Sequence, residues 1–169
     1  NDVELMQMAI TYLLTTRGIP QILYGTEVLM NNTGNLKNDG IIRSDFPGGW
    51  PTDTVSAFTN KGLTSKQLQT KNYLSTLLNW RKVNNVIANG NFLHFAPFDG
   101  LYVYFRYNKQ KTVMVILNIN NSEKSLDTAR FAEILSAKKT FTDIFSKKTY
   151  PLQKAVLVPA KTALVFEVQ

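Results

Sequence analysis

Residues 18–27 read Gly-Ile-Pro-Gln-Ile-Leu-Tyr-Gly-Thr-Glu, and this stretch decides the fold of the chain. A helical pattern precedes it, and Gly18 can end that helix in the left-handed conformation that a residue with a Cβ resists. Pro20 prevents the helix from resuming. Residues 22–24 then form a short apolar run, typical of a strand buried on both faces. Helix, tight turn, buried strand and polar loop together make one unit of an α/β protein.

The loop after this strand is the first place to look for a functional site. In parallel sheets and barrels, ligands bind in the loops that follow the carboxyl ends of the strands. Residues 31–50 are rich in Asn, Gly and Asp and show little hydrophobic periodicity. They are longer than an ordinary connection, and such loops are usually functional or disordered. Further on, Asp53 is expected to cap a short helical turn that reaches Phe58.

Helical signals flank the loop on both sides. Asp2 is placed to cap a helix that runs to about Thr16 and is apolar on most of its sides, so this helix needs partners nearly all round. Thr64 and Gln67 have the spacing of a capping box, which predicts a second helix ending near Val83.

From Phe92 onward the hydrophobic period changes from the 3.6 of a helix to the 2 of a strand. Short strands at regular spacing predict an antiparallel β-sandwich for residues 88–169, after a boundary at 84–91. A short helix is expected within residues 128–136. The predicted strands cover residues 101–107, 111–117, 139–144, 152–157 and 163–168.

Composition excludes several classes of protein. The chain has no cysteine, so disulfides and thiolate metal sites are absent, and no apolar run approaches the roughly 20 residues of a membrane span. The net charge of +7 comes mainly from scattered lysines in the second half, which fit strand edges better than a phosphate-binding surface. Because the sequence starts without Met and without the features of a signal peptide, we expect a fragment or a processed chain.

The first half of the chain resembles a known family. Residues 18–27 resemble the eighth barrel strand of the alpha-amylase superfamily of glycoside hydrolases. Residues 38–43, Asn-Asp-Gly-Ile-Ile-Arg, and residues 45–50, Asp-Phe-Pro-Gly-Gly-Trp, resemble the following loop in its neopullulanase and cyclomaltodextrinase branch. The resemblance implies that residues 1–87 are the C-terminal segment of a (β/α)8 catalytic barrel. Residues 88–169 would be the family's C-terminal sandwich domain.

The resemblance also implies an activity for the parent protein: retaining hydrolysis of starch, pullulan or cyclodextrins. This reaction needs two carboxyl groups about 5–5.5 Å apart. In the family these groups lie on earlier strands, and no Asp or Glu of this chain matches their motifs, so we expect the chain alone to be inactive. Transferases and isomerases of the superfamily share the strand motif.

The candidate site residues are Asp39 and Arg43 first, then Trp50 and Tyr24. A carboxylate and a guanidinium can bind paired sugar hydroxyls, and in the resembled branch this pair holds a glucose unit on the non-reducing side of the cleaved bond. The alternative is an exposed loop salt bridge of little value to stability. Many relatives carry Pro where this chain has Gly40.

The remaining aromatic residues allow two interpretations. Trp50 is suited either to stack on a sugar ring or to pack under the loop, and Tyr24 is expected to support the site. The tyrosines of residues 102–107 and His94 are expected to serve packing. An aromatic platform for glucan would instead make the chain a non-catalytic carbohydrate-binding module.

We expect no cofactor in this chain. The resemblance allows for a calcium ion in the parent enzyme. The expected partners are an α-glucan oligosaccharide and either the preceding part of the barrel or another copy of the chain. Neither nucleic acid nor a membrane is expected as a partner. Analogy with the family points to a periplasmic or extracellular location.

Overall fold

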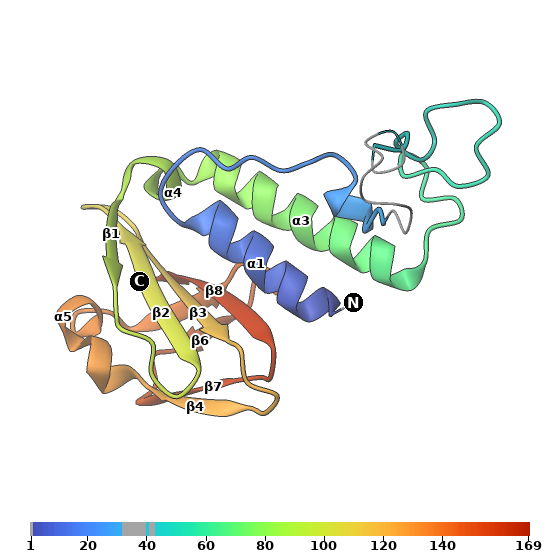
Figure 1. Ribbon diagram of the computed structural model, residues 1–169. Helices are drawn as coiled ribbons and strands as arrows, with labels where there is room; N and C mark the ends of the chain where they lie inside the picture. Colours follow the sequence, from blue (N-terminus) through green and yellow to red (C-terminus); the bar gives the residue numbers. More distant parts are fainter. Residues whose placement is uncertain (1, 32–39, 41–42) are drawn as a thin grey trace. The chain divides into compact units, whose positions relative to one another are not determined.

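A computed structural model describes residues 2–31, 40 and 43–169 (Figure 1). The chain divides into two compact units, and each is described by itself. The first unit joins residues up to Pro20 with Thr76–Gln169, and the second is Gln21–Ser75. The predicted boundary between a barrel part and a sandwich part, at 84–91, concerns the whole protein and stays a prediction.

Two antiparallel sheets form most of the first unit. The larger sheet has six strands in the order β1-β2-β3-β8-β5-β6, and the smaller pairs β4 with β7. This arrangement agrees with the predicted antiparallel sandwich. In chain order the strands are β1 (Asn91–His94), β2 (Leu101–Tyr107), β3 (Thr112–Asn118), β4 (Lys124–Asp127), β5 (Thr140–Asp143), β6 (Thr149–Pro151), β7 (Ala155–Val158) and β8 (Thr162–Val168).

The hydrophobic core of the sandwich follows from strand alternation. Phe105 on β2, Met114 on β3 and Phe166 on β8 belong to one buried cluster. A short helical segment closes it: η2 (Thr128–Phe131) and α5 (Ala132–Leu135), both within the range predicted to hold a helix. In β2, β3 and β8 the residues of this cluster stand at every second position, so they share one face of the sheet, while β3 is buried along its whole length.

Helix α1 (Val3–Thr15) lies along the six-stranded sheet and packs against β8 (Figure 1). Asp2 caps it as predicted, since its Oδ1 accepts the Leu5 N–H at 3.2 Å. The hydroxyls of Thr15 and Tyr104 meet at 2.5 Å, and both residues are fully buried. No helix in the described part of the chain is long and apolar enough to cross a membrane.

The end of helix α3 (Ser65–Val83) and helix α4 (Asn85–Asn89) also contact the sheet. Trp80 donates its indole N–H to Glu167 at 2.7 Å. Arg106 is 1% exposed, donates to the Ile87 carbonyl at 2.7 Å and lies over the Phe92 ring. Burial lowers the pKa of Arg106, and the nearby Arg17 and Arg81 lower it further. These contacts hold the end of α3 and the segment that leads from it to β1 against the sheet.

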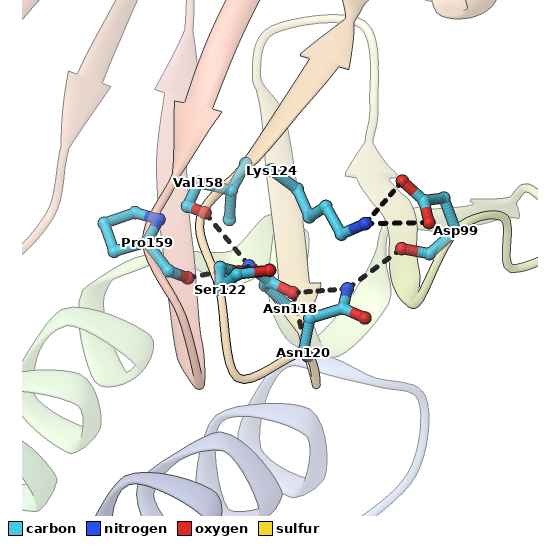
Figure 2. A network of polar contacts seen from close by, with 7 residues as sticks. All are labelled: Asp99, Asn118, Asn120, Ser122, Lys124, Val158 and Pro159. Atoms are coloured by element: carbon cyan, nitrogen blue, oxygen red, sulfur yellow. Dashed lines mark hydrogen bonds and ion pairs between the residues drawn. The ribbon is translucent and has the colours of Figure 1, made fainter.

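A network around Asn118 fixes the connection from β3 to β4 (Figure 2). The buried Asn118 amide donates to the carbonyls of Val158 at 3.0 Å and Pro159 at 2.9 Å, and its oxygen accepts the Asn120 N–H at 2.9 Å. Asn120 in turn donates to the Asp99 carbonyl at 2.9 Å. The Asn118 side chain therefore bonds backbone groups of two segments, at 120 and at 158–159, and Asn120 adds a third at Asp99. Buried backbone groups of this kind need hydrogen-bond partners.

The second unit is built around the first part of α3. The capping box forms as predicted, because Gln67 N–H donates to Thr64 Oγ1 at 3.3 Å and Thr64 N–H donates to Gln67 Oε1 at 2.9 Å. Gln67 also donates its amide to the Val28 carbonyl at 2.9 Å, next to the single turn η1 (Thr26–Val28).

The strand predicted at residues 22–24 is not formed, and this local prediction is wrong for the structure described. Residues 21–23 are in no strand, Tyr24 lies in a turn, and the Leu23 side chain is 71% exposed. A strand buried on both faces needs hydrogen-bonding neighbours on both edges. The described residues of the second unit include no other strand that could supply them.

We predict that Tyr104→Phe destabilises the first unit. The substitution keeps the ring and removes the hydroxyl that meets Thr15, so the free energy of unfolding should fall by about 1–2 kcal/mol. Urea denaturation followed by circular dichroism measures this change. Tyr150→Phe, at a 45% exposed position, is the matched control and should leave the urea midpoint unchanged. Equal midpoints for all three proteins would contradict the prediction.

A second prediction concerns pH. Lys161 donates to Asp2 at 2.6 Å, and this hydrogen bond, followed by the one from Leu5, lowers the pKa of Asp2 from 3.8 to about 2. Because the folded pKa is below the unfolded one, the stabilisation is present above about pH 4 and is lost as the pH falls toward 2.

Asp2→Asn keeps a capping oxygen and removes the charge. Its melting temperature should therefore lie below that of the unmodified chain at pH 6, and the two should converge toward pH 2. Thermal melts across this range check it, and Lys161→Met should show the same convergence. A difference that is constant with pH would show that the ion pair has no part in it.

Candidate functional site

The predicted site residues fall in the second unit, where the chain reverses after Tyr24. Gly25 has a φ of 85°, and a Cβ there would collide with the Met30 side chain, so only glycine permits this turn. The Tyr24 hydroxyl donates to the Ser44 carbonyl at 3.0 Å. Ser44 follows Arg43 directly, so this hydrogen bond brings Tyr24 beside the segment that carries Arg43. Asp39 lies outside the described residues.

Trp50 is held at two points. Its indole N–H donates to Asp45 Oδ2 at 3.0 Å, and its backbone N–H donates to Asp53 Oδ2 at 3.1 Å. The side chain is nevertheless 61% exposed. The two hydrogen bonds orient the indole and leave its apolar surface in contact with solvent.

Asp53 organises the turn before it and does not cap the residues after it. The same Oδ2 atom accepts the Gly48 N–H at 2.7 Å as well as that of Trp50. The expected helical turn toward Phe58 is therefore wrong: residues 55–58 form no helix. Gly48 has a φ of 97°, and a Cβ at this position would collide with Ser56. The absence of a side chain at Gly48 therefore lets the chain fold back on itself here.

Helix α3 supports the far side of this segment. Lys71 donates to the Ala57 carbonyl and to Asn60 Oδ1, the latter at 2.7 Å. Ala57 N–H donates to the Pro47 carbonyl at 3.0 Å, which links the helix contact to the turn that carries Trp50. A regular element thus positions the loop, as is usual for binding loops.

The arrangement favours binding over bond-breaking chemistry. The described part of the loop offers an exposed indole, a phenol and a guanidinium, which together suit a neutral ligand with hydroxyl groups and apolar ring faces. The carboxylates of Asp45 and Asp53 already accept N–H groups of the loop. Across residues 2–31, 40 and 43–169, no three His, Cys, Asp or Glu side chains form a group that could hold a metal ion.

Sequence reasoning missed the residues that position the site. Ser44 contributes only a backbone carbonyl, which no side-chain pattern reveals. Asp45 and Asp53 were recognisable as polar loop residues, but their partners five and three positions from them are set by the turn itself.

The aromatic residues of the first unit form a second cluster, on β1, β2 and α1. His94 stacks on Phe92 with ring centroids 5.7 Å apart, and the Tyr102 ring lies 6.2 Å from His94 and 6.3 Å from Tyr12. Tyr12 is 46% exposed. Burial raises the pKa of Tyr102, and Tyr12 raises it further.

Comparison with known proteins identifies similar sequences and folds. Residues 92–167 match the profile of the family described as "Cyclo-malto-dextrinase C-terminal domain". A cyclomaltodextrin glucanotransferase of Geobacillus stearothermophilus is 30% identical over 142 residues, which are 84% of this chain and 17% of the relative. The corresponding enzyme of Niallia circulans is 28% identical over 138 residues, 77% of this chain and 17% of the relative.

Solved structures match over nearly the whole chain. An alpha-amylase from Geobacillus thermoleovorans, complexed with acarbose, superposes with a TM-score of 0.72 at 19% identity, over 100% of this chain and 34% of the other. A gamma-cyclomaltodextrin glucanotransferase from alkalophilic Bacillus clarkii gives a TM-score of 0.67 at 19% identity, over 99% and 23%. At these identities the likeness shows the fold alone.

These matches support an alpha-amylase-family C-terminal domain in the second half of the chain. The chain spans less than a fifth of the length of the curated relatives it matches.

The indole hydrogen bond gives a prediction for the loop. Asp45→Ala removes the acceptor of the Trp50 N–H, so its NMR resonance should shift upfield and its exchange with solvent should become about fivefold faster. The Trp80 indole, bonded to Glu167, is an internal control whose resonance should not move. An unchanged Trp50 resonance would mean that the indole is held by other contacts.

Proposed function

We propose that this chain is the C-terminal part of a retaining glycoside hydrolase of the alpha-amylase family that acts on α-glucans such as starch, pullulan or cyclodextrins. The neopullulanase and cyclomaltodextrinase branch is our specific assignment. It is supported by the match of residues 92–167 to a cyclomaltodextrinase C-terminal domain and by the loop sequence that resembles this branch. A periplasmic or extracellular location and calcium in the parent enzyme stay predictions.

In this proposal, residues 1–87 complete the catalytic barrel. Helix α1, the extended residues that follow it and helix α3 then correspond to the last helix-strand-helix segment. The likeness of fold to whole alpha-amylases over the full length of the chain supports this assignment. Residues 22–24 would pair on both edges only in the presence of the preceding strands, which accounts for their exposure here.

The loop would contribute sugar binding. The observation that carries this role is a pair of hydrogen bonds to the two residues directly after Arg43: Tyr24 to Ser44 and Trp50 to Asp45. Because these hydrogen bonds fix the Ser44 backbone and the Trp50 ring, a ligand that binds at Arg43 and Trp50 would lose less entropy in ordering residues 44–50. Asp39 and Arg43 would bind paired hydroxyls of one glucose unit, and Trp50 would cover a ring face.

Catalysis itself would come from carboxyl groups elsewhere in the parent protein. A retaining mechanism uses one carboxylate as the nucleophile and a second group as the acid, which later acts as the base toward water. The residues of this chain would hold the substrate in register with that pair, and correct positioning contributes strongly to the rate.

We predict that the purified chain alone hydrolyses no α-glucan. Reducing-sugar assays on starch, pullulan and cyclodextrins, run beside a mock purification, check this. Release of sugar that follows the chain through purification, and is absent from the mock sample, would place catalytic groups within these residues.

We also predict that Asp39→Ala in the full-length enzyme mainly weakens substrate binding. A hydrogen bond to a charged group contributes about 1.5–3 kcal/mol, so the specificity constant should fall by about 10- to 100-fold. Arg43→Lys keeps the positive charge but loses the forked donor geometry of the guanidinium. Its specificity constant on the same substrates should also fall.

The matched control is Glu133→Ala, which removes an exposed carboxylate on α5 and should leave the specificity constant unchanged. The substrates must be oligosaccharides long enough to fill this subsite. An unchanged specificity constant for Asp39→Ala would favour the alternative of a loop salt bridge.

A second candidate function is a non-catalytic carbohydrate-binding module. The ring cluster of Tyr12, Phe92, His94 and Tyr102, in which Tyr12 and His94 are exposed and the other two half-buried, favours it, since these rings place hydroxyl and imidazole groups beside apolar faces. Calorimetric titration of the whole chain with maltoheptaose separates the two functions. Binding lost in Tyr102→Ala and kept in Trp50→Ala would support the module, and the reverse would support the loop.

A further inference from the structure

Three arginine residues meet at one corner of the first unit, where α1 and α3 end beside α4 (Figure 1). Arg81 of α3 donates to the carbonyl of Leu14 and, at 3.4 Å, to that of Gly18. Arg17 lies between these two residues in the chain, so the backbone that carries it passes beside the Arg81 guanidinium. Arg17 and Arg81 are therefore neighbours at the end of α1.

Arg106 of β2 faces the same corner. Arg106 and Tyr104 are two residues apart within β2, so their side chains share one face of the sheet. On this face the Tyr104 hydroxyl meets Thr15, which is two residues before Arg17. The Arg106 guanidinium donates to the Ile87 carbonyl on α4 at 2.7 Å. The contacts of Arg106 and its neighbour Tyr104 thus reach both helices of the corner, α4 and the end of α1.

The Arg106 guanidinium carries more hydrogen-bond donors than the protein satisfies. The residue is 1% exposed, and its Nε and Nη1 atoms have no hydrogen-bond partner among the described residues. These two atoms carry three of the five N–H groups of a guanidinium. The Phe92 ring, whose centroid is 5.8 Å from the Arg106 Cζ, covers a flat face of the group and does not accept the N–H groups at its edge. Buried donors nearly always have an acceptor, so these N–H groups indicate a bound ligand.

The charge of the corner selects an anion. Burial lowers the pKa of Arg106, and Arg17 and Arg81 are near enough to lower it further. Across residues 2–31, 40 and 43–169, none of the three arginines forms an ion pair with a carboxylate. The Glu167 carboxylate, two strands away on β8, accepts the Trp80 N–H instead. A water molecule would accept the N–H groups but leave the charges unbalanced, and buried charges are paired as a rule.

We infer that Arg17, Arg81 and Arg106 bind a small tetrahedral oxyanion, of the class of inorganic phosphate. A planar guanidinium presents its N–H groups at the spacing of two oxygen atoms, which such an anion matches and a spherical chloride ion does not. Arg106 supplies the buried N–H groups, while the half-buried Arg81 and the exposed Arg17 add positive charge toward solvent. The bound anion ties the ends of α1 and α3 to β2. The inference concerns the first unit alone and does not depend on the proposed glucan activity.

NMR of the arginine side chains, during titration of the whole chain with inorganic phosphate, tests the inference. The Arg106 Nε–H resonance should move with a saturating dependence on phosphate concentration, and its exchange with solvent should become slower. Sulfate should act in the same way, and chloride at equal ionic strength should not. Arg130 is an internal control whose resonance should not move, since it also donates to a carbonyl, that of Ala96 at 2.7 Å, and lies over the Phe98 ring. An Arg106 resonance that phosphate and chloride move equally, or that does not saturate, would overturn the inference.

Substitutions test whether the three arginines act together, with calorimetry to measure phosphate affinity and circular dichroism to check each fold. Arg17→Gln removes a charge at an exposed position and should weaken binding about fivefold. Arg130→Gln removes the same charge on η2 and should leave the affinity unchanged. Arg106→Lys keeps the positive charge but loses the forked donor geometry, and should weaken binding about tenfold or more. If Arg106→Lys does not fold, the other two variants still decide the question, because equal phosphate affinities in Arg17→Gln and Arg130→Gln would refute the site.

Discussion

The buried hydrogen bond between Thr15 and Tyr104 is the contact on which the first unit depends. Thr15 also donates to the Thr11 carbonyl at 2.6 Å, so its hydroxyl can only accept from Tyr104. The end of α1 is thereby fixed against the middle of β2, at a site where both side chains are fully buried and a lost partner leaves a polar group unsatisfied. The hydrogen bond from Trp80 to Glu167 joins the end of α3 to β8 in the same way. Helices and sheet therefore form one unit, although the hydrophobic period of the sequence changes near residue 92.

The loop that carries the candidate site is positioned by a different means. Its described contacts are hydrogen bonds within turns and the one from Tyr24 to Ser44, with Lys71 of α3 as the link to a regular element. Such a loop can present exposed side chains in fixed orientations without a hydrophobic core of its own. The two parts therefore divide the work: the sandwich is held by burial, and the loop by polar contacts that leave Trp50 in solvent.

What the sequence predicts well is what depends on nearby residues. The Asp2 cap, the Thr64–Gln67 capping box and the alternation in β2, β3 and β8 are local, and all of them form. The strand at residues 22–24 depends on neighbours from other strands, and it does not form among the described residues. Asn118 and Arg106 escaped notice for a similar reason, because their partners are fixed only when the chain has folded. For the candidate site, the sequence indicated the residue types, but it did not indicate the hydrogen bonds that Ser44 and Asp45 accept.

The position of β8 between β3 and β5 has a consequence for synthesis on the ribosome. The hairpin of β2 and β3 and the hairpin of β5 and β6 can each form as soon as they emerge, yet nothing joins them until residues 162–168 are translated. Until then both hairpins carry an open edge, the condition under which nascent sheets pair wrongly with other chains. A ribosome that pauses shortly before these residues would expose those edges for longest, so this stretch of the message is where translation speed should matter most to the yield of folded protein.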